Sequence, residues 1–337
     1  MAYTRELVDR LSGSVVGRRS EIEQVIAGLA AGRHLLLEGP PGTGKSTLLR
    51  RIATELECGF CFVEGNAELT PSRLVGTFDP AAVIEAGYSP DVFLDGPLVT
   101  ALRDGALLYI EEINRIPEET LNVLISVMSE GSLHVPRLGE VTAAEGFRLV
   151  AAMNPFDAVG TARISGAVYD RVCRLAMGYQ RSDEEMLIVG NQARVAAAAV
   201  GPGFIVQATE MVRATREHPD LRTGSSVRGA IDLTMVAAEL HTIRDLEATD
   251  PRVTRDAAQL ALSGRVKVRD GCGRSAADII DELWAIFFAP ELDDEPEEDA
   301  EAANGTDGPK AQSHLRAVAM GSSPTIPSSR ATRPVGP

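Results

Sequence analysis

The sequence predicts an α/β fold in which a parallel sheet is covered by helices on both faces and is followed by an all-α lid and a disordered tail. Two observations lead to this prediction. Short apolar runs alternate with helical patterns up to about residue 180, which is typical of a buried parallel sheet. From Ser182 onward the strand signals mostly stop and helical periodicity dominates.

Five apolar runs have the length of buried strands. They cover residues 34–37, 60–63, 106–110, 147–153 and 173–177. Between them, residues 118–129 are one of the expected covering helices. Its apolar residues follow the spacing i, i+3, i+4 and i+7, namely Leu121, Leu124, Ile125 and Met128.

The second half of the chain reads as a helical domain. Helical patterns cover residues 182–200, 203–217, 226–246, 254–266 and 275–289, and one of them has an apolar face made of Ala230, Leu233, Ala237 and Leu240. The change in pattern predicts a domain over 1–180 and a helical domain over 181–290. Residues 291–337 are acidic and then rich in Gly, Ser and Pro, so we expect a disordered tail that either solubilises the protein or docks a partner.

Length and charge set broad limits. The 337 residues, 44% of them hydrophobic, are enough for one or two cores, and a net charge of −15 argues against a general nucleic-acid surface. The N-terminus lacks the apolar core of a signal peptide, and no apolar run approaches the roughly 20 residues needed to cross a bilayer. We therefore expect a cytoplasmic protein. Four cysteines fit a reducing compartment, and the lone Cys58/Cys61 pair is expected to be structural.

A glycine-rich segment between the first apolar run and the following helix has the spacing G-x-x-x-x-G-K-[ST]. Its residues are Gly39, Pro40, Pro41, Gly42, Thr43, Gly44, Lys45 and Ser46, with Thr47 next in the helix. In this context the glycines let backbone N–H groups point at phosphate oxygens, while Lys45 neutralises the terminal phosphates and the Ser46 hydroxyl ligates Mg²⁺. The segment predicts nucleotide binding but does not specify a reaction.

Polar side chains end two other apolar runs. Glu111 and Glu112 follow residues 106–110, at the strand end where ligands of such sheets bind. We expect Glu111 to hold Mg²⁺ and Glu112 to orient and polarise the attacking water. Asn154 follows residues 147–153 and is expected to hydrogen-bond that water or the γ-phosphate; taken alone, it also fits an ordinary Asn-Pro turn.

The chain resembles the AAA+ ATPases, and within them the MoxR group, which is related to the magnesium chelatase ATPase subunits. The resemblance covers about Val15 to Val268. It depends on the order of the segments Val16-Gly-Arg-Arg, Gly39 to Ser46, Leu69 to Thr77, Gly96-Pro-Leu98, Glu111 to Arg115, Asn154-Pro155, Gly160-Thr161, Asp170-Arg171 and Gly224 to Arg228.

The resemblance implies a role for each of these site residues. Lys45 and Ser46 match Walker A, Glu111 and Glu112 match Walker B, and Asn154 matches sensor 1. Arg171 matches the arginine finger, which reaches the nucleotide of a neighbouring subunit, and Arg228 matches sensor 2 in the lid. The chain departs from the family pattern at Glu111, where Asp is usual, at Ala152-Met153 and at Val227. A longer acid at position 111 puts the hydrolysis rate in question.

The family's function follows as an expectation. The resemblance implies Mg²⁺-dependent ATP hydrolysis in a homo-oligomeric, hexameric ring that remodels, assembles or inserts a cofactor into a client protein, often with a von Willebrand factor A domain partner. Inserted hairpins at 78–95 and 132–145 are expected to face the pore or the client. Two alternatives stay open: a nucleotide-gated scaffold with negligible turnover, and a chelatase-type or DNA-acting motor. The sequence shows no stripe of basic and aromatic residues suited to nucleic-acid strands, which argues against the second alternative.

Overall fold

The computed structural model describes residues 3–155 and 164–289. The chain divides into two units, Met1–Ile188 and Val189–Pro337. The first contains the main sheet, and the second is mostly helical in its described residues. The limits predicted for the domains, at 180 and 290, stay predictions, and the predicted disordered tail at 291–337 lies outside the described residues.

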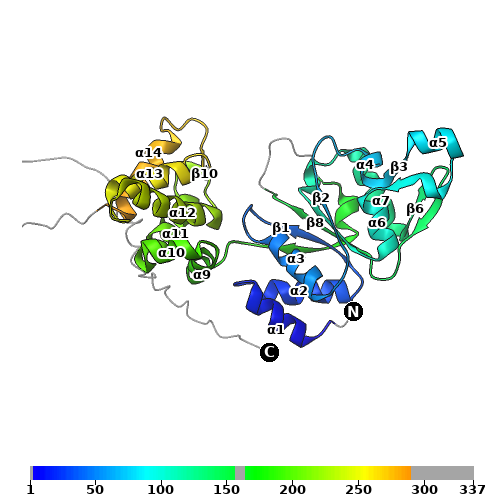
Figure 1. The fold of residues 1–337 in the computed structure, drawn as a ribbon, viewed down its shortest axis with the longest axis horizontal. Helices are drawn as coiled ribbons and strands as arrows, with labels where there is room; N and C mark the ends of the chain where they lie inside the picture. Colours follow the sequence, from blue (N-terminus) through cyan, green and yellow to red (C-terminus); the bar gives the residue numbers. More distant parts are fainter. Residues whose placement is uncertain (1–2, 156–163, 290–337) are drawn as a thin grey trace, which may run out of the picture. The chain divides into compact units, whose positions relative to one another are not determined.

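The five predicted apolar runs form one parallel sheet (Figure 1). Its strands are β1 (His34–Glu38), β2 (Phe60–Glu64), β5 (Leu107–Glu111), β8 (Arg148–Met153) and β9 (Val172–Ala176). They pair in the order β2-β5-β8-β1-β9. The chain leaves β1 toward one side of the sheet and later crosses β1 to reach β9 on the other. Strand order thus reverses at β1, where ligands of open α/β sheets bind.

Successive strand residues point to opposite faces of the sheet, and each face has its own core. One core combines Leu36, Leu108 and Leu149 with apolar residues of three helices. These helices are α4 (Pro71–Val75), α6 (Pro97–Asp104) and α7 (Glu118–Glu130). Leu121 and Leu124 of α7 are buried there, as the helical spacing predicts.

The opposite core covers Leu35 and Leu37 of β1 and Tyr109 of β5. Its helices are α1 (Arg5–Ser14), α2 (Arg19–Ala30) and α3 (Lys45–Glu55), which lie together on one side of the sheet in Figure 1. Helices on both faces of a parallel sheet confirm the predicted fold class.

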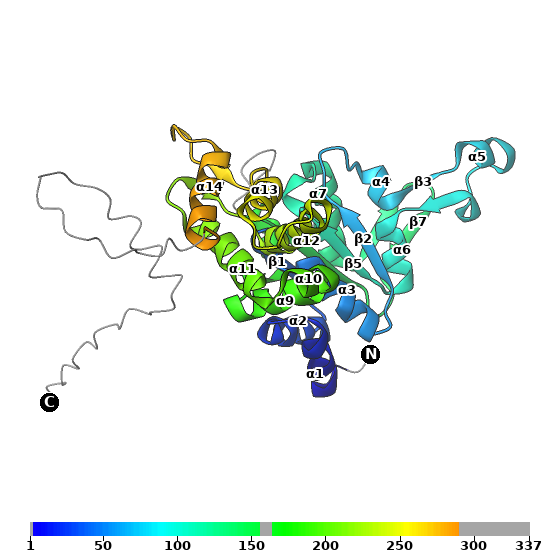
Figure 2. The ribbon, with the colours of Figure 1, turned by 60° about the vertical axis from the view of Figure 1, so that its left-hand side comes forward.

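Both predicted insertions are antiparallel hairpins. The first pairs β3 (Gly76–Phe78) with β4 (Phe93–Asp95), and the second pairs β6 (Ser132–Val135) with β7 (Gly139–Thr142). The first also contains α5 (Pro80–Ala86) and a short 3-10 turn, Pro90–Val92, so its connection is longer and more ordered than a simple hairpin. Figure 2 shows α5 at the tip, beyond β3. The guanidinium of Arg137, in the second hairpin, lies 3.8 Å from the ring centroid of Tyr88 in the first.

The second unit contains most of the predicted helices, with different limits. They are α9 (Ser182–Gln192, which begins in the first unit), α10 (Arg194–Val200), α11 (Pro202–Glu217), α12 (Val227–Arg244), α13 (Pro251–Leu262) and α14 (Ala276–Phe287). The single helix predicted over 182–200 is interrupted at Ala193, which is 4% exposed and has φ −103° and ψ 36°. Helix α13 begins earlier than predicted because the Asp250 side chain accepts a hydrogen bond from the Arg252 N–H and caps its first turn.

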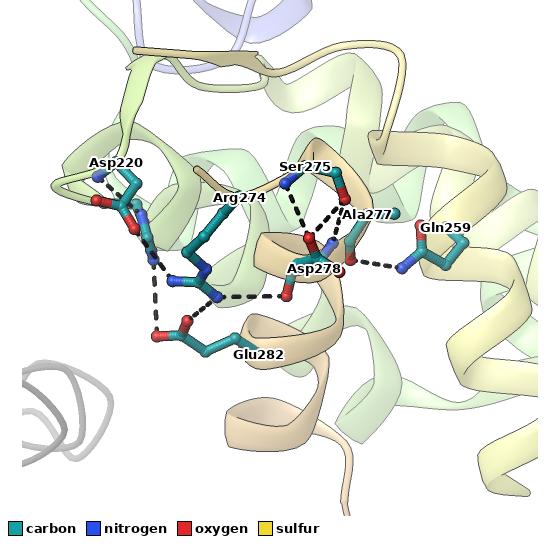
Figure 3. Close-up of polar contacts among 8 residues, drawn as sticks. Asp220, Gln259, Arg274, Ser275, Ala277, Asp278 and Glu282 are labelled. Atoms are coloured by element: carbon teal, nitrogen blue, oxygen red, sulfur yellow. Dashed lines mark hydrogen bonds and ion pairs between the residues drawn. The ribbon is translucent and has the colours of Figure 1, made fainter. Parts of the chain in front are cut away.

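Polar contacts join the last helix of this unit to the segment before β10 (Leu221–Thr223). β10 and β11 (Lys267–Val268) form a short antiparallel pair. Arg274 then joins Asp220, at 3.0 Å, to Glu282 of α14, and Ser275 and Asp278 form a capping box at the start of that helix (Figure 3). Within residues 3–155 and 164–289 no single helix is long and apolar enough to cross a bilayer, whereas α10 and α11, bent by 109°, pass that test only as a pair.

Candidate functional site

The segment between β1 and α3 forms a loop that requires glycine at three positions. Gly42 has a φ of 76° and Gly44 a φ of 86°, in the left-handed region that favours glycine. At Gly39 a methyl group would lie 2.1 Å from the carbonyl oxygen of Met177. Lys45 then begins α3, so the loop leads directly to the positive end of a helix. This geometry suits the binding of an anion by backbone N–H groups.

The Lys45 ammonium lies against the loop itself. Its Nζ donates to the carbonyl oxygens of Gly39 and Pro40, both at 2.9 Å, and lies 3.4 Å from Oγ1 of Thr43. The Thr43 hydroxyl in turn donates to the Pro40 carbonyl at 3.0 Å. Lys45 is 8% exposed, so its charge is held within the loop, where it can neutralise a phosphate. Pro41 is exposed at the tip of the loop, as is Thr47 in the first turn of α3.

The predicted metal ligands are in direct contact. Ser46 Oγ donates to Oε1 of Glu111 at 2.8 Å, and it also lies 3.2 Å from the Tyr109 hydroxyl. A hydroxyl and a carboxylate are hard oxygen ligands of the kind that Mg²⁺ takes, and Mg²⁺ usually completes its shell with nucleotide phosphates and water. The described residues contain no cluster of three or more His, Cys, Asp or Glu side chains that could hold a metal. The donor set therefore fits a nucleotide-associated Mg²⁺ and not a cage made by the protein alone.

Glu112 occupies a strained backbone position directly after β5. Its φ is 54°, a left-handed conformation that costs a non-glycine residue about 1 kcal/mol or more. The turn directs the chain into the 3-10 segment Ile113–Arg115, and Arg115 Nε lies 3.0 Å from Oε2 of Glu112. The Glu112 side chain is 38% exposed, so water can reach it.

Asn154 lies at the same edge of the sheet. It follows Met153, the last residue of β8, which pairs in parallel with both β5 and β1. Parallel strands end at a common edge, and this edge also contains the glycine-rich loop, Glu111 and Glu112. The structure thus brings Lys45, Ser46, Glu111, Glu112 and Asn154 to one edge, although their individual roles stay predictions.

Arg171 lies at the opposite end of the parallel strands, where they begin. It directly precedes β9, whose five residues run parallel to β1, and a strand of that length spans about 16 Å. Its guanidinium is bound within its own chain, because Nε donates to Ser129 Oγ at 2.5 Å and Nη1 donates to the Ala167 carbonyl at 2.8 Å. Arg171 is therefore not assembled with Lys45 in the same chain.

Arg228 belongs to the other unit. It is exposed at the second position of α12, next to the buried Val227 that departs from the family pattern. Its predicted role as sensor 2 stays a prediction.

Sequence reasoning gave no role to two residues that contact the site. Arg18 is 3% exposed and its Nη2 donates to the carbonyl oxygens of Thr43, at 2.8 Å, and Gly178, at 2.6 Å. It therefore ties the glycine-rich loop to the segment after β9. Tyr109 is fully buried beside Ser46. Strand alternation could have identified Tyr109, because it lies two residues before Glu111 on the same face. The contact of Arg18 with Gly178 spans 160 residues and has no local signal.

Comparison with known proteins agrees with this fold. Residues 34–172 match the family model for the AAA domain of the dynein-related subfamily. The uncharacterized protein YeaC of Bacillus subtilis is 29% identical over 274 residues, which cover 72% of this chain and 82% of YeaC. The gas vesicle ATPase GvpN of Haloferax mediterranei is 29% identical over 235 residues, which cover 65% of each protein.

Among solved structures, a mutant of Thermotoga maritima RuvB has a TM-score of 0.51 at 19% identity, over 73% of this chain and 70% of RuvB. At that identity the likeness shows the fold. The matched family model and the order of the strands agree with this fold, and residues 34–172 are similar to the AAA domain of the dynein-related subfamily.

Proposed function

We propose that this protein is a MoxR-like, Mg²⁺-dependent AAA+ ATPase that works as a homo-oligomeric ring to remodel, assemble or insert a cofactor into a client protein. One observation supports a shared catalytic site most directly. Lys45, Ser46, Glu111, Glu112 and Asn154 meet at one edge of the sheet, whereas Arg171 lies at the other. A site that needs all of them is completed by a second copy of the chain.

The residues of the first edge have complementary tasks. Backbone N–H groups of the loop and the Lys45 ammonium bind the β- and γ-phosphates, and Ser46 and Glu111 hold the cation. Bound Mg²⁺ would supply positive charge to the phosphate oxygens. Glu112 orients the attacking water and accepts its proton, and the Asn154 amide hydrogen-bonds the water or the γ-phosphate.

The ion pair of Glu112 with Arg115 fits this role. Arg115 Nε lies 3.0 Å from Glu112 Oε2 and helps to orient the carboxylate, and a general base must be held within reach of the proton that it accepts. The backbone at Glu112 is left-handed, and such strain is often retained where it serves a site.

The ring is proposed to be a hexamer, by resemblance to the MoxR group, with a von Willebrand factor A domain partner. The two hairpins at 76–95 and 132–142 are the proposed client-facing elements. Ile84 of α5 is 86% exposed and Leu94 of β4 is 57% exposed, so the first hairpin offers apolar surface.

One alternative has a specific observation in its favour. Glu111 replaces the usual Asp, and a longer arm at the cation favours a scaffold that binds ATP and turns it over negligibly. Tight ATP binding with hydrolysis near background would identify that scaffold, and sustained phosphate release would reject it.

A mixing experiment tests the shared site. Glu112→Gln and Arg171→Ala variants should each be inactive alone. In a 1:1 mixture about a quarter of the interfaces would combine an intact Glu112 with an intact Arg171 from the neighbouring copy, so a corresponding part of the activity returns. If the two variants bind ATP and assemble together but their mixture stays inactive, the shared site is wrong. Full activity of Arg171→Ala alone would remove Arg171 from it.

A further inference from the structure

Tyr109 carries a hydroxyl group into the predicted metal site from inside the sheet core. Its side chain is 0% exposed. It lies in β5 two residues before Glu111, so both side chains point to the face covered by α3. Ser46 lies in the first turn of that helix. The core of the sheet and the cation site therefore meet at this tyrosine.

The Tyr109 hydroxyl contacts one predicted metal ligand directly and the other through it. It lies 3.2 Å from Ser46 Oγ, which itself donates to Glu111 Oε1 at 2.8 Å. Because the Ser46 hydroxyl gives its one proton to Glu111, the Tyr109 hydroxyl is the donor in its contact with Ser46.

The ring of Tyr109 is fixed by its neighbours. Phe60 and Phe62 of β2 lie with ring centroids 6.0 and 5.7 Å from it, and Phe62 is its register partner across the strands. The Arg50 guanidinium lies 5.4 and 5.0 Å from the centroids of the same two phenylalanine rings. A hydroxyl on a ring packed in this way has little freedom to move.

We propose that Tyr109 is a positioning residue that holds the Ser46 hydroxyl, and through it the Glu111 carboxylate, in place for the cation, and that it thereby compensates for the longer arm of Glu111. Glu has one more C–C bond than Asp, about 1.5 Å, and one more torsion to fix. Ser46 supplies the donor that fixes it, and the Tyr109 hydroxyl holds Ser46 in the way that outer partners orient metal ligands. This inference rests on the proposed Mg²⁺-dependent ATP binding.

The test is a Mg²⁺ titration of the full chain with a fluorescent ATP analogue, starting from EDTA-treated protein. In Tyr109→Phe the ring remains and only the hydroxyl is lost. We expect affinity for the analogue without metal to match wild type, and the Mg²⁺ concentration for half-maximal effect to rise about tenfold. Tyr169→Phe is the matched control, because it removes a tyrosine hydroxyl from a hydrogen bond outside the predicted metal ligands, to Glu38 Oε1 at 2.8 Å, and it should leave the Mg²⁺ midpoint unchanged.

A double-mutant cycle separates positioning from packing. In Glu111→Asp the acid has one torsion fewer to fix, so adding Tyr109→Phe should shift the midpoint far less than it does in wild type. An unchanged midpoint in Tyr109→Phe, or the same shift in both backgrounds, overturns the role of Tyr109 while wild type still shows Mg²⁺-dependent binding. Wild type without Mg²⁺-dependent binding overturns both the inference and the proposed function.

Discussion

Substitution of Gly65 by Ala would displace the backbone of Glu111 and Glu112 without changing either of their side chains. Gly65 follows β2, and its N–H donates to the Glu111 carbonyl at 2.7 Å. A methyl group at this position would lie 2.4 Å from the Glu112 carbonyl oxygen and 2.9 Å from that of Glu111. Ordinary contact begins at 3.4 Å, so the end of β5 must move by about 1 Å.

We expect Gly65→Ala to lower kcat about 100-fold, because a displacement of about 1 Å can cost that much when the reacting groups must be aligned. ATP affinity should change little, since the Gly39–Ser46 loop is not among the nearest contacts of the added methyl group. Steady-state phosphate release at saturating ATP and equilibrium ATP binding measure the two effects.

Gly13→Ala is the matched control for this experiment. Gly13 is exposed in α1, and a methyl group there meets nothing within 4 Å. It should leave both measurements unchanged. A kcat for Gly65→Ala equal to that of wild type would show that the position of Glu112 does not limit hydrolysis, which refutes the reasoning.

Two further predictions concern stability. Arg18→Ala removes a buried guanidinium that also pairs with Glu21 at 2.5 Å. It should lower the free energy of unfolding in urea by about 3 kcal/mol and weaken ATP binding. Arg19→Ala, which removes an exposed ion pair, should lower the free energy of unfolding by less than about 1 kcal/mol. Equal losses in the two variants would contradict the proposed role of Arg18. Burial, and then the charge of Arg148, lower the pKa of His34 to about 4, and its Nδ1 accepts the Leu149 N–H. In the unfolded chain His34 binds a proton near pH 6.5, whereas in the folded chain it stays neutral until about pH 4. Because of this residue, the free energy of unfolding should fall by up to about 3 kcal/mol as the pH is lowered from 6.5 to 4. His34→Gln should remove that part of the slope, and an unchanged slope would contradict the assignment.

The sequence was sufficient to predict the centre of the sheet because β1, β5 and β8 are buried on both faces. Runs such as Leu35-Leu36-Leu37 have no polar residue that could face water, which is typical of a parallel sheet between helices. The site was predictable in part for a related reason. Polar residues that end such runs, Glu111 and Asn154, must gather at the common edge of the parallel strands.

Other features depend on tertiary contacts that no local pattern reports. The break at Ala193 is not at a Gly or Pro, although Gly190 lies three residues before it, and an alanine-rich helical pattern continues beyond it. The clamp of Arg18 joins segments 25 and 160 residues away. In contrast, α5 had readable signals that were overlooked: Asp79 caps it by accepting from the Ala81 N–H, Pro80 begins it, and Gly87 ends it.

Phosphate release by wild type and by Glu112→Gln, measured at micromolar protein with ATP and Mg²⁺, tests the proposed hydrolysis most directly. The substitution keeps the shape of the side chain and removes its ability to accept a proton. Wild type should release phosphate steadily, while Glu112→Gln should bind ATP and keep the ring together without turnover. Equal rates in the two proteins, or no release by either, would contradict ATP hydrolysis at this site.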